Sequence, residues 1–192
     1  MLDTEKRPGR ITASRALDMM TKGRGKDKEF GETALTYAKE LALKRIGFEP
    51  DDIKTWQMEW GNEWEPHAFE VYTQSRGEVL PSQFVTYEDY AGASPDGFVG
   101  TDGLLEIKCP QWKAHVDHLL NGPARGYVYQ MQFQMFVTGR KWCDFFSFHP
   151  HFPDHIKGKV IRVERDETLM YDFADRLPKF EAIVVEYVKA LE

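Results

Sequence analysis

The chain has 192 residues and a mass of 22.3 kDa, and 42% of its residues are hydrophobic. This length and composition suffice for one domain with a sizeable core, so we predict a single domain over residues 1–192. No apolar run approaches the roughly 18 residues of a membrane-spanning helix, and no basic-then-apolar leader is present, so we expect a cytoplasmic protein without membrane contact. Two cysteines without CxxC spacing exclude a disulfide framework and an all-cysteine zinc or iron–sulfur site.

The net charge of −6 is unevenly distributed. Residues 1–48 contain 11 Lys and Arg against 7 Asp and Glu, whereas residues 49–106 contain 2 against 13. A carboxylate-rich centre is suited to divalent cations, and a basic first quarter could meet phosphates. Solvated helix surfaces would produce the same distribution, so charge alone leaves both interpretations open.

The predicted elements alternate between helices and strands. A basic Pro/Gly loop over residues 6–15 leads into a helix capped by Thr12 or Ser14 that ends near Gly23. Such a loop at a helix N-terminus can bind an anion, although an ordinary helix cap is the alternative. From there we expect helices at 32–46 and 58–75, strands at 79–87, 90–99 and 104–109, helices at 112–120 and 127–137, strands at 142–148 and 160–164, and a final helix at 167–191.

Three of these segments carry features with two interpretations. Trp60 and Trp64 form a stripe at helical spacing, which is more typical of core packing than of base stacking. Gln130 and Gln134 lie one turn apart on an otherwise apolar helix, and either a polar functional face or a structural amide ladder would explain them. The His-rich segment 149–155 resembles a zinc site, but its two prolines favour a surface loop.

The most informative stretch is residues 94–109, where an apolar strand carries two charges, Glu106 and Lys108. Residues two apart share a face of a strand, so these two side chains project together. The glycines between Asp96 and Glu106 indicate a hairpin. We predict a loop with an odd number of residues, such as 101–103 with Gly103 left-handed, because this register brings Asp96 to the same face.

Two carboxylates and a lysine on one surface are the components of a metal-dependent phosphodiesterase. Asp96, Glu106 and the carbonyl of Ile107 can supply part of the oxygen shell that Mg²⁺ prefers, with a second ion about 3.5 to 4 Å away. Lys108 would position the attacking water or stabilise the transition state. A buried ion pair between Glu106 and Lys108 is the structural alternative.

Several blocks of sequence together resemble one family. The Pro-Asp and Glu-x-Lys arrangement is similar to the PD-(D/E)xK nucleases, and the match to the phage lambda exonuclease and YqaJ-type viral recombinase family covers nearly the whole chain. The matching blocks are Ile11–Ser14, Trp60-Gly61 with Glu65, Ser94–Gly97, Leu105–Pro110, and Tyr127 with Gln130 and Gln132. The resemblance implies an α/β, restriction-endonuclease-like core with a central mixed sheet flanked by helices.

The resemblance also implies an activity. We expect a Mg²⁺-dependent 5′→3′ exonuclease that degrades one strand of double-stranded DNA from its end and leaves a 3′ overhang for recombination by strand annealing. Two metal ions are expected, and Mn²⁺ can substitute. The resemblance further implies a homotrimeric ring, a single-strand annealing protein as partner, and a phage or prophage gene expressed in a bacterial host. A structure-specific endonuclease of the same superfamily and a non-catalytic DNA-end-binding module are the alternatives.

The resemblance assigns roles residue by residue. Asp96, Glu106 and Ile107 are implied as metal ligands and Lys108 as the catalytic lysine. Glu65 is implied as an acidic group near the second metal, and Gln130 as the residue that helps hold the nucleophilic water. A pocket for the 5′-phosphate is implied at Arg7, Ser14 and Ser94, and a wedge that separates the terminal base pair at Met58.

Overall fold

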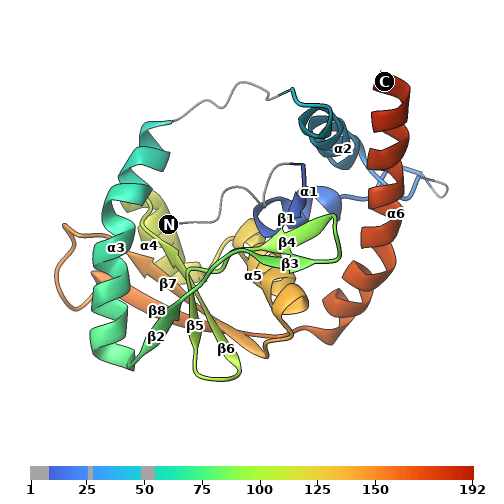
Figure 1. Cartoon of the computed structure of the whole chain (residues 1–192). Coiled ribbons are helices and arrows are strands. Elements are labelled where there is room, and N and C mark those ends of the chain that lie inside the picture. Colours follow the sequence, from blue (N-terminus) through green and yellow to red (C-terminus); the bar gives the residue numbers. More distant parts are fainter. Residues whose placement is uncertain (1–8, 26–27, 49–54) are drawn as a thin grey trace.

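The computed structural model describes residues 9–25, 28–48 and 55–192, and it contains a large and a small β-sheet flanked by helices (Figure 1). The large sheet has the order β2-β5-β6-β7-β8, formed by Val79–Pro81, Gly97–Val99, Gly103–Lys108, Trp142–Phe148 and Gly158–Glu164. The small sheet has the order β1-β4-β3, formed by Ile11–Thr12, Ala91–Ala93 and Val85–Tyr87. The helices are η2 (Ala13–Arg15), α1 (Ala16–Met19), α2 (Glu32–Arg45), α3 (Trp56–Arg76), α4 (Trp112–Asn121), α5 (Arg125–Thr138) and α6 (Glu167–Leu191).

The loop of the hairpin between β5 and β6 has an odd number of residues, as predicted. Val99 pairs with Gly103 and Gly97 with Leu105, so the loop is residues 100–102, an odd number. The loop lies one residue earlier than the expected 101–103, and the left-handed glycine is Gly100 (φ 53°) instead of Gly103. Gly97, the residue after Asp96, is favoured by close packing and not by its backbone angles, because an added Cβ would lie 2.3 Å from a methyl group of Val79.

The two faces of the large sheet are covered by different helices. Strands β6 and β7 are parallel, so the chain crosses over between them through α4 and α5. On one face, Tyr72 of α3 packs in a cluster with Leu105 and Ile107. On the other face, Met131 of α5 packs with Leu104. Glu106 and Lys108 alternate with Leu105 and Ile107, so they lie on the α5 face.

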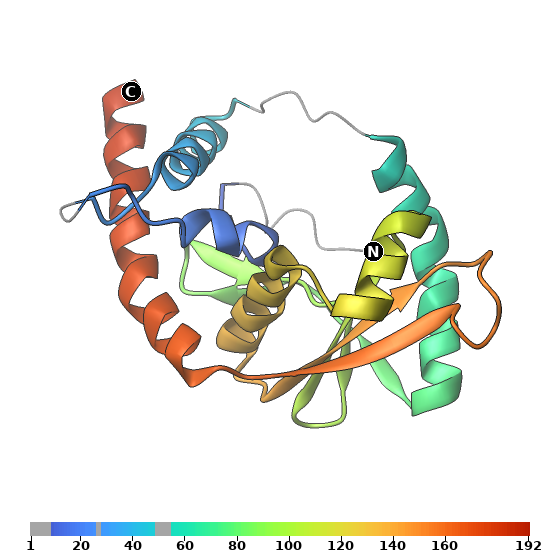
Figure 2. The same cartoon turned by 180° about the vertical axis from the view of Figure 1, so that it is seen from behind.

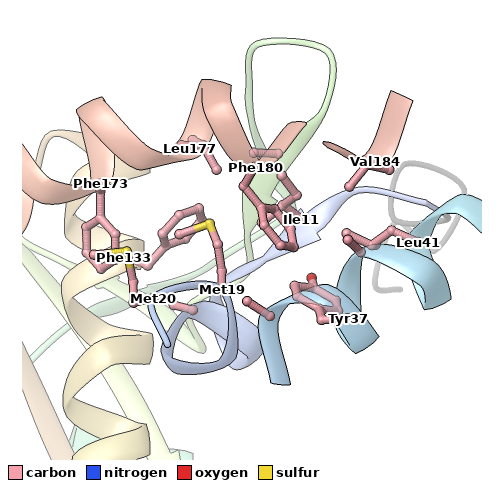
Figure 3. Packing of buried hydrophobic residues seen from close by; sticks show 14 of the residues in the cluster. Ile11, Met19, Met20, Tyr37, Leu41, Phe133, Phe173, Leu177, Phe180 and Val184 are labelled. Carbon is pink, nitrogen blue, oxygen red and sulfur yellow. The ribbon is translucent and has the colours of Figure 1, made fainter. Parts of the chain in front are cut away.

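A separate apolar cluster joins the N-terminal segment to the end of the chain (Figure 3). Tyr37 of α2 stacks on Phe180 of α6 with ring centroids 5.7 Å apart. Phe133 of α5 contributes to the same cluster, and Figure 2 shows α5 (brown) in front of the small sheet (green). Helix α5 therefore packs against this cluster through Phe133 and against the large sheet through Met131, which fixes the position of its polar residues.

Several elements differ from the sequence prediction. The predicted strands 79–87 and 90–99 are each divided between the two sheets, because the chain passes from one sheet to the other near Pro81 and again near Pro95, where prolines cannot donate ladder hydrogen bonds. The first predicted helix is shorter and ends at Met19. The helices predicted at 58–75 and 167–191 are present as α3 and α6, and both continue through exposed prolines, Pro66 and Pro178. Among the described residues, no helix is long and apolar enough to span a membrane.

Candidate active site

Asp96 is fixed to strand β6 by two hydrogen bonds. Its backbone N–H donates to the carbonyl of Leu105 at 2.9 Å, and its Oδ2 accepts from the N–H of Ile107 at 2.5 Å. Continuing the strand register by one residue from the Gly97–Leu105 pair places Asp96 opposite Glu106. The hairpin therefore brings the two carboxylates together, as the odd loop predicted.

Glu106 is buried, with 1% of its surface exposed, and both of its carboxylate oxygens accept hydrogen bonds. Oε1 accepts from Lys108 Nζ and from Gln130 Nε2, the latter at 2.6 Å. Oε2 accepts from Gln134 Nε2 at 2.6 Å. A buried carboxylate is expensive unless it is paired and hydrogen-bonded, and these three donors meet that requirement. The ion pair that the sequence left as an alternative is present, within a larger network.

The charges at this site shift one another's pKa values. Burial raises the pKa of Asp96 well above its usual value, the Glu106 carboxylate raises it further, and the Lys108 ammonium opposes both. Burial alone would lower the pKa of Lys108, but the carboxylates of Glu106 and Asp96 outweigh it and raise the pKa, so the ammonium stays protonated.

Glu65 contributes to the same electrostatic field from α3. Part of the residue is exposed to solvent, but desolvation by the surrounding protein raises the pKa of its carboxyl. The Lys108 ammonium opposes this shift, and the Glu106 carboxylate adds to it. Glu65 is therefore close enough to interact with both charged residues of β6, as an acidic group beside the site would.

The donor set is suited to a hard divalent cation. Asp96 and Glu106 offer carboxylate oxygens, and the carbonyl of Ile107 lies in the same strand segment. Burial raises the pKa of Asp96 most and the Glu106 carboxylate adds to it, and a bound cation would offset both by favouring the ionised form. Within the described part of the chain, however, no three His, Cys, Asp or Glu residues are grouped to hold a metal ion. Among the described residues, Glu65 therefore does not join Asp96 and Glu106 in a group of three metal ligands. The His-rich segment 149–155 does not form a group of three metal ligands either.

A small cavity of about 130 Å³ is lined by Thr12, Ala13, Ser14, Phe84, Ser94 and Gln130. The Ser94 hydroxyl is buried, and it has no hydrogen-bond partner among the described residues. The structure thus brings together Ser14 and Ser94, which were predicted to share a phosphate pocket, and Gln130 connects this cavity to Glu106. Arg7 lies outside the described residues.

Met58 lies in the first turn of α3 and is 48% exposed. Its backbone N–H donates to the side chain of Thr55, which caps the helix. Further along α3, Trp60 and Trp64 are partly buried and pack against the exposed His151. Trp64 also packs against the apolar cluster that contains Tyr72, so the predicted core packing is confirmed for Trp64.

Sequence reasoning did not assign Gln134 to the site. It is fully buried and bonds Glu106 directly, as Gln130 does, so the two amides form one polar face of α5 directed at Glu106. The available signal was the spacing of four residues from Gln130, which places both amides on one helix face. Gln132 bonds elsewhere, to the carbonyl of Glu164 and the N–H of Asp166.

A model of the YqaJ-like viral recombinase domain matches residues 4–141. The chain belongs to this family. It is similar to the alkaline exonuclease LHK-Exo from Laribacter hongkongensis, with 35% identity, a TM-score of 0.86, and coverage of 97% of this chain and 93% of the other. The structure of LHK-Exo in complex with dAMP gives 36% identity, coverage of 96% and 92%, and a TM-score of 0.85.

A phage-related exonuclease from Haemophilus somnus 129PT shares the fold at 15% identity, with a TM-score of 0.83 and coverage of 95% of this chain and 96% of the other. No curated protein matches the sequence. The family and the PD-(D/E)xK-type fold expected from the residues are therefore confirmed.

Proposed function

We propose that this chain degrades one strand of double-stranded DNA in the 5′→3′ direction, using Mg²⁺, and leaves a 3′ single-stranded overhang. The broader activity follows from the family: the chain is a DNA exonuclease. The observation that supports the finer proposal is that Asp96, Glu106 and Lys108 lie together, and that Gln130, which bonds Glu106, lines a small cavity with Ser94. The buried Ser94 hydroxyl has no hydrogen-bond partner among the described residues. LHK-Exo binds dAMP, a mononucleotide of the kind that an exonuclease releases.

The chemistry is divided between a metal and the side chains. Asp96, Glu106 and the Ile107 carbonyl would hold a first Mg²⁺ and Glu65 would lie near a second, with Mn²⁺ able to substitute. When bound, such ions activate water and neutralise charge on the scissile phosphate. Lys108 remains protonated and stabilises that charge as a point cation. Gln130, which bonds Glu106 and lines the cavity, helps to hold the attacking water.

End recognition is proposed at the adjacent cavity. Hydroxyl donors at Ser14 and Ser94 suit the oxygens of a 5′-phosphate, and Arg7 from the basic N-terminal loop would supply a guanidinium. Met58, exposed at the start of α3, would separate the terminal base pair. These positions would explain a preference for 5′-phosphorylated duplex ends.

The assembly is proposed from family resemblance. We expect a homotrimeric ring around DNA that works with a single-strand annealing protein in recombination. The setting would be the cytoplasm of a bacterial host carrying the phage or prophage gene.

Strand-resolved digestion tests the proposal. A linear duplex with a 5′-phosphate on one strand only, and a distinct label on each strand, is incubated with the protein in Mg²⁺ and in EDTA. The proposal predicts shortening of the phosphorylated strand from its 5′ end in Mg²⁺ alone, with closed circular DNA left intact. Shortening from the 3′ end, digestion in EDTA, or equal cutting of circles would contradict it, and the last result would favour an endonuclease.

A further inference from the structure

Gln134 lies between the carboxylate network and the proposed end-binding cavity. Its Nε2 is 2.6 Å from Glu106 Oε2 and 3.5 Å from the backbone carbonyl of Ser94. Both partners are acceptors, so the side-chain amide must direct its N–H₂ group toward them, and its two hydrogens can serve one acceptor each. Gln134 is 0% exposed, so it cannot contact DNA directly.

The two bonds differ in strength. The bond to Glu106 is short and assisted by charge, whereas the contact with Ser94 lies at the long limit of a hydrogen bond. Ser94 also has a buried hydroxyl without a partner among the described residues, at the wall of the cavity. A phosphate oxygen that engages this hydroxyl would hold Ser94 in place and strengthen the weaker of the two bonds.

We infer that Gln134 is a positioning residue that couples occupation of the cavity at Ser94 to the orientation of Glu106. This inference rests on the proposed function. Its consequence is that a 5′-phosphate accelerates the cut itself, in addition to any effect on DNA binding. The other oxygen of Glu106 is held by Lys108 and Gln130, so Gln134 controls the remaining rotational freedom of the carboxylate.

The neighbouring Gln132 provides a matched control. It is 2% exposed on the same helix and makes two hydrogen bonds of similar length, at 2.7 Å to Glu164 O and 2.9 Å from Asp166 N. These bonds attach α5 to β8 and to the start of α6, away from Glu106. Gln134→Met and Gln132→Met therefore remove comparable buried amides, but only the first disturbs the site.

The experiment measures release of the first nucleotide only, because later cuts act on ends that the enzyme has itself made. Enzyme in excess over a duplex with a 5′-phosphate or a 5′-hydroxyl gives the single-turnover rate and the half-saturating enzyme concentration for each end. The wild-type chain should cut the phosphorylated end at least tenfold faster at saturation. Gln134→Met should bring this rate ratio close to one without changing half-saturation more than about twofold, and Gln132→Met should keep the wild-type ratio.

A second variant tests the hydrogen bonds themselves. Gln134→Asn keeps a buried amide but shortens the side chain by one methylene, so its N–H₂ group no longer reaches both Glu106 and Ser94. The ratio of saturating rates on phosphorylated and hydroxyl ends should therefore fall in Gln134→Asn and keep its wild-type value in Gln132→Asn. This readout remains available if Gln134→Met does not fold.

The outcomes separate the two claims. A wild-type chain that releases no nucleotide from the 5′ end would overturn the proposed function. If the wild-type chain cuts both ends at the same saturating rate and the 5′-phosphate lowers only the half-saturating enzyme concentration, the coupling is overturned. The preference for phosphorylated ends would then remain as an effect on binding. Retention of the wild-type rate ratio by Gln134→Met or by Gln134→Asn would likewise overturn the coupling alone.

Discussion

The carboxylate of Asp96 accepts a hydrogen bond of 2.5 Å from the backbone N–H of Ile107, eleven residues later in the chain. This bond locks the segment before β5 onto β6 at the place where Glu106 and Lys108 project. The position of the first carboxylate therefore depends on backbone geometry, and the length of the 100–102 loop determines whether the site forms.

Removing the charge of Asp96 should stabilise the metal-free chain. Burial and the Glu106 carboxylate raise the folded-state pKa of Asp96 above its unfolded value, so the ionised form costs stability once the pH exceeds the folded pKa. In EDTA at alkaline pH, Asp96→Asn should raise the free energy of unfolding. The gain should shrink as the pH falls through the folded pKa, because wild-type Asp96 then becomes neutral. Urea denaturation at several pH values measures both effects.

In Mg²⁺ the wild type should be more stable than Asp96→Asn, because an ion that binds the folded wild type stabilises it. Asp102→Asn, which changes a half-exposed residue in the loop of the same hairpin, is the control and should stay within about 0.5 kcal/mol of wild type. An Asp96→Asn variant that is less stable than wild type in EDTA at alkaline pH would contradict the predicted cost of an ionised Asp96 that is buried beside Glu106.

Ser94→Ala should weaken recognition of phosphorylated ends. The variant removes a buried hydroxyl with no partner in the described chain, so little stability should be lost, and half-saturation on 5′-phosphorylated duplex should rise several-fold. Half-saturation on 5′-hydroxyl duplex should not change. Arg7→Ala should act in the same direction, and an unchanged end preference in either variant would remove that residue from the pocket.

Tyr72→Phe should destabilise the sheet without altering the site. The buried Tyr72 hydroxyl donates to Asp144 Oδ2 at 2.8 Å, and Asp144 also accepts two bonds from Arg162, at 2.8 and 3.0 Å. Loss of a hydrogen bond to a charged group should cost about 1.5 to 3 kcal/mol, measured by urea denaturation. Tyr171→Phe, at a tyrosine that is 74% exposed, is the control, and an equal effect of both variants would contradict this assignment.

Much of the fold was predictable because its signals are local. Alternating charges on an apolar strand placed Glu106 and Lys108 on one face, and glycines between Asp96 and Glu106 indicated the hairpin. Helical spacing similarly identified α2, α3 and α5 within a few residues of their bounds.

The unpredicted features depend on contacts between distant segments. The small sheet pairs Ile11 with Ala91, and nothing local distinguishes this pairing from continuous long strands. The spacing of Gln130 and Gln134 placed both amides on one helix face, but only the position of α5 against β6 shows that this face reaches Glu106. Ser94 was assigned to the phosphate pocket from the sequence, but the burial of its hydroxyl depends on the packing of distant segments.

The central claim is that the carboxylates and lysine on β6 perform metal-dependent hydrolysis of DNA ends. It is tested most directly by measuring the single-turnover cleavage rate of a 5′-phosphorylated duplex in Mg²⁺ for wild type and Lys108→Ala, with DNA binding measured in parallel. The account predicts a rate loss of about 10² to 10³-fold or more in the variant, with DNA affinity retained, because the lost charge acts on the transition state. A Lys108→Ala variant that cleaves at the wild-type rate would contradict it.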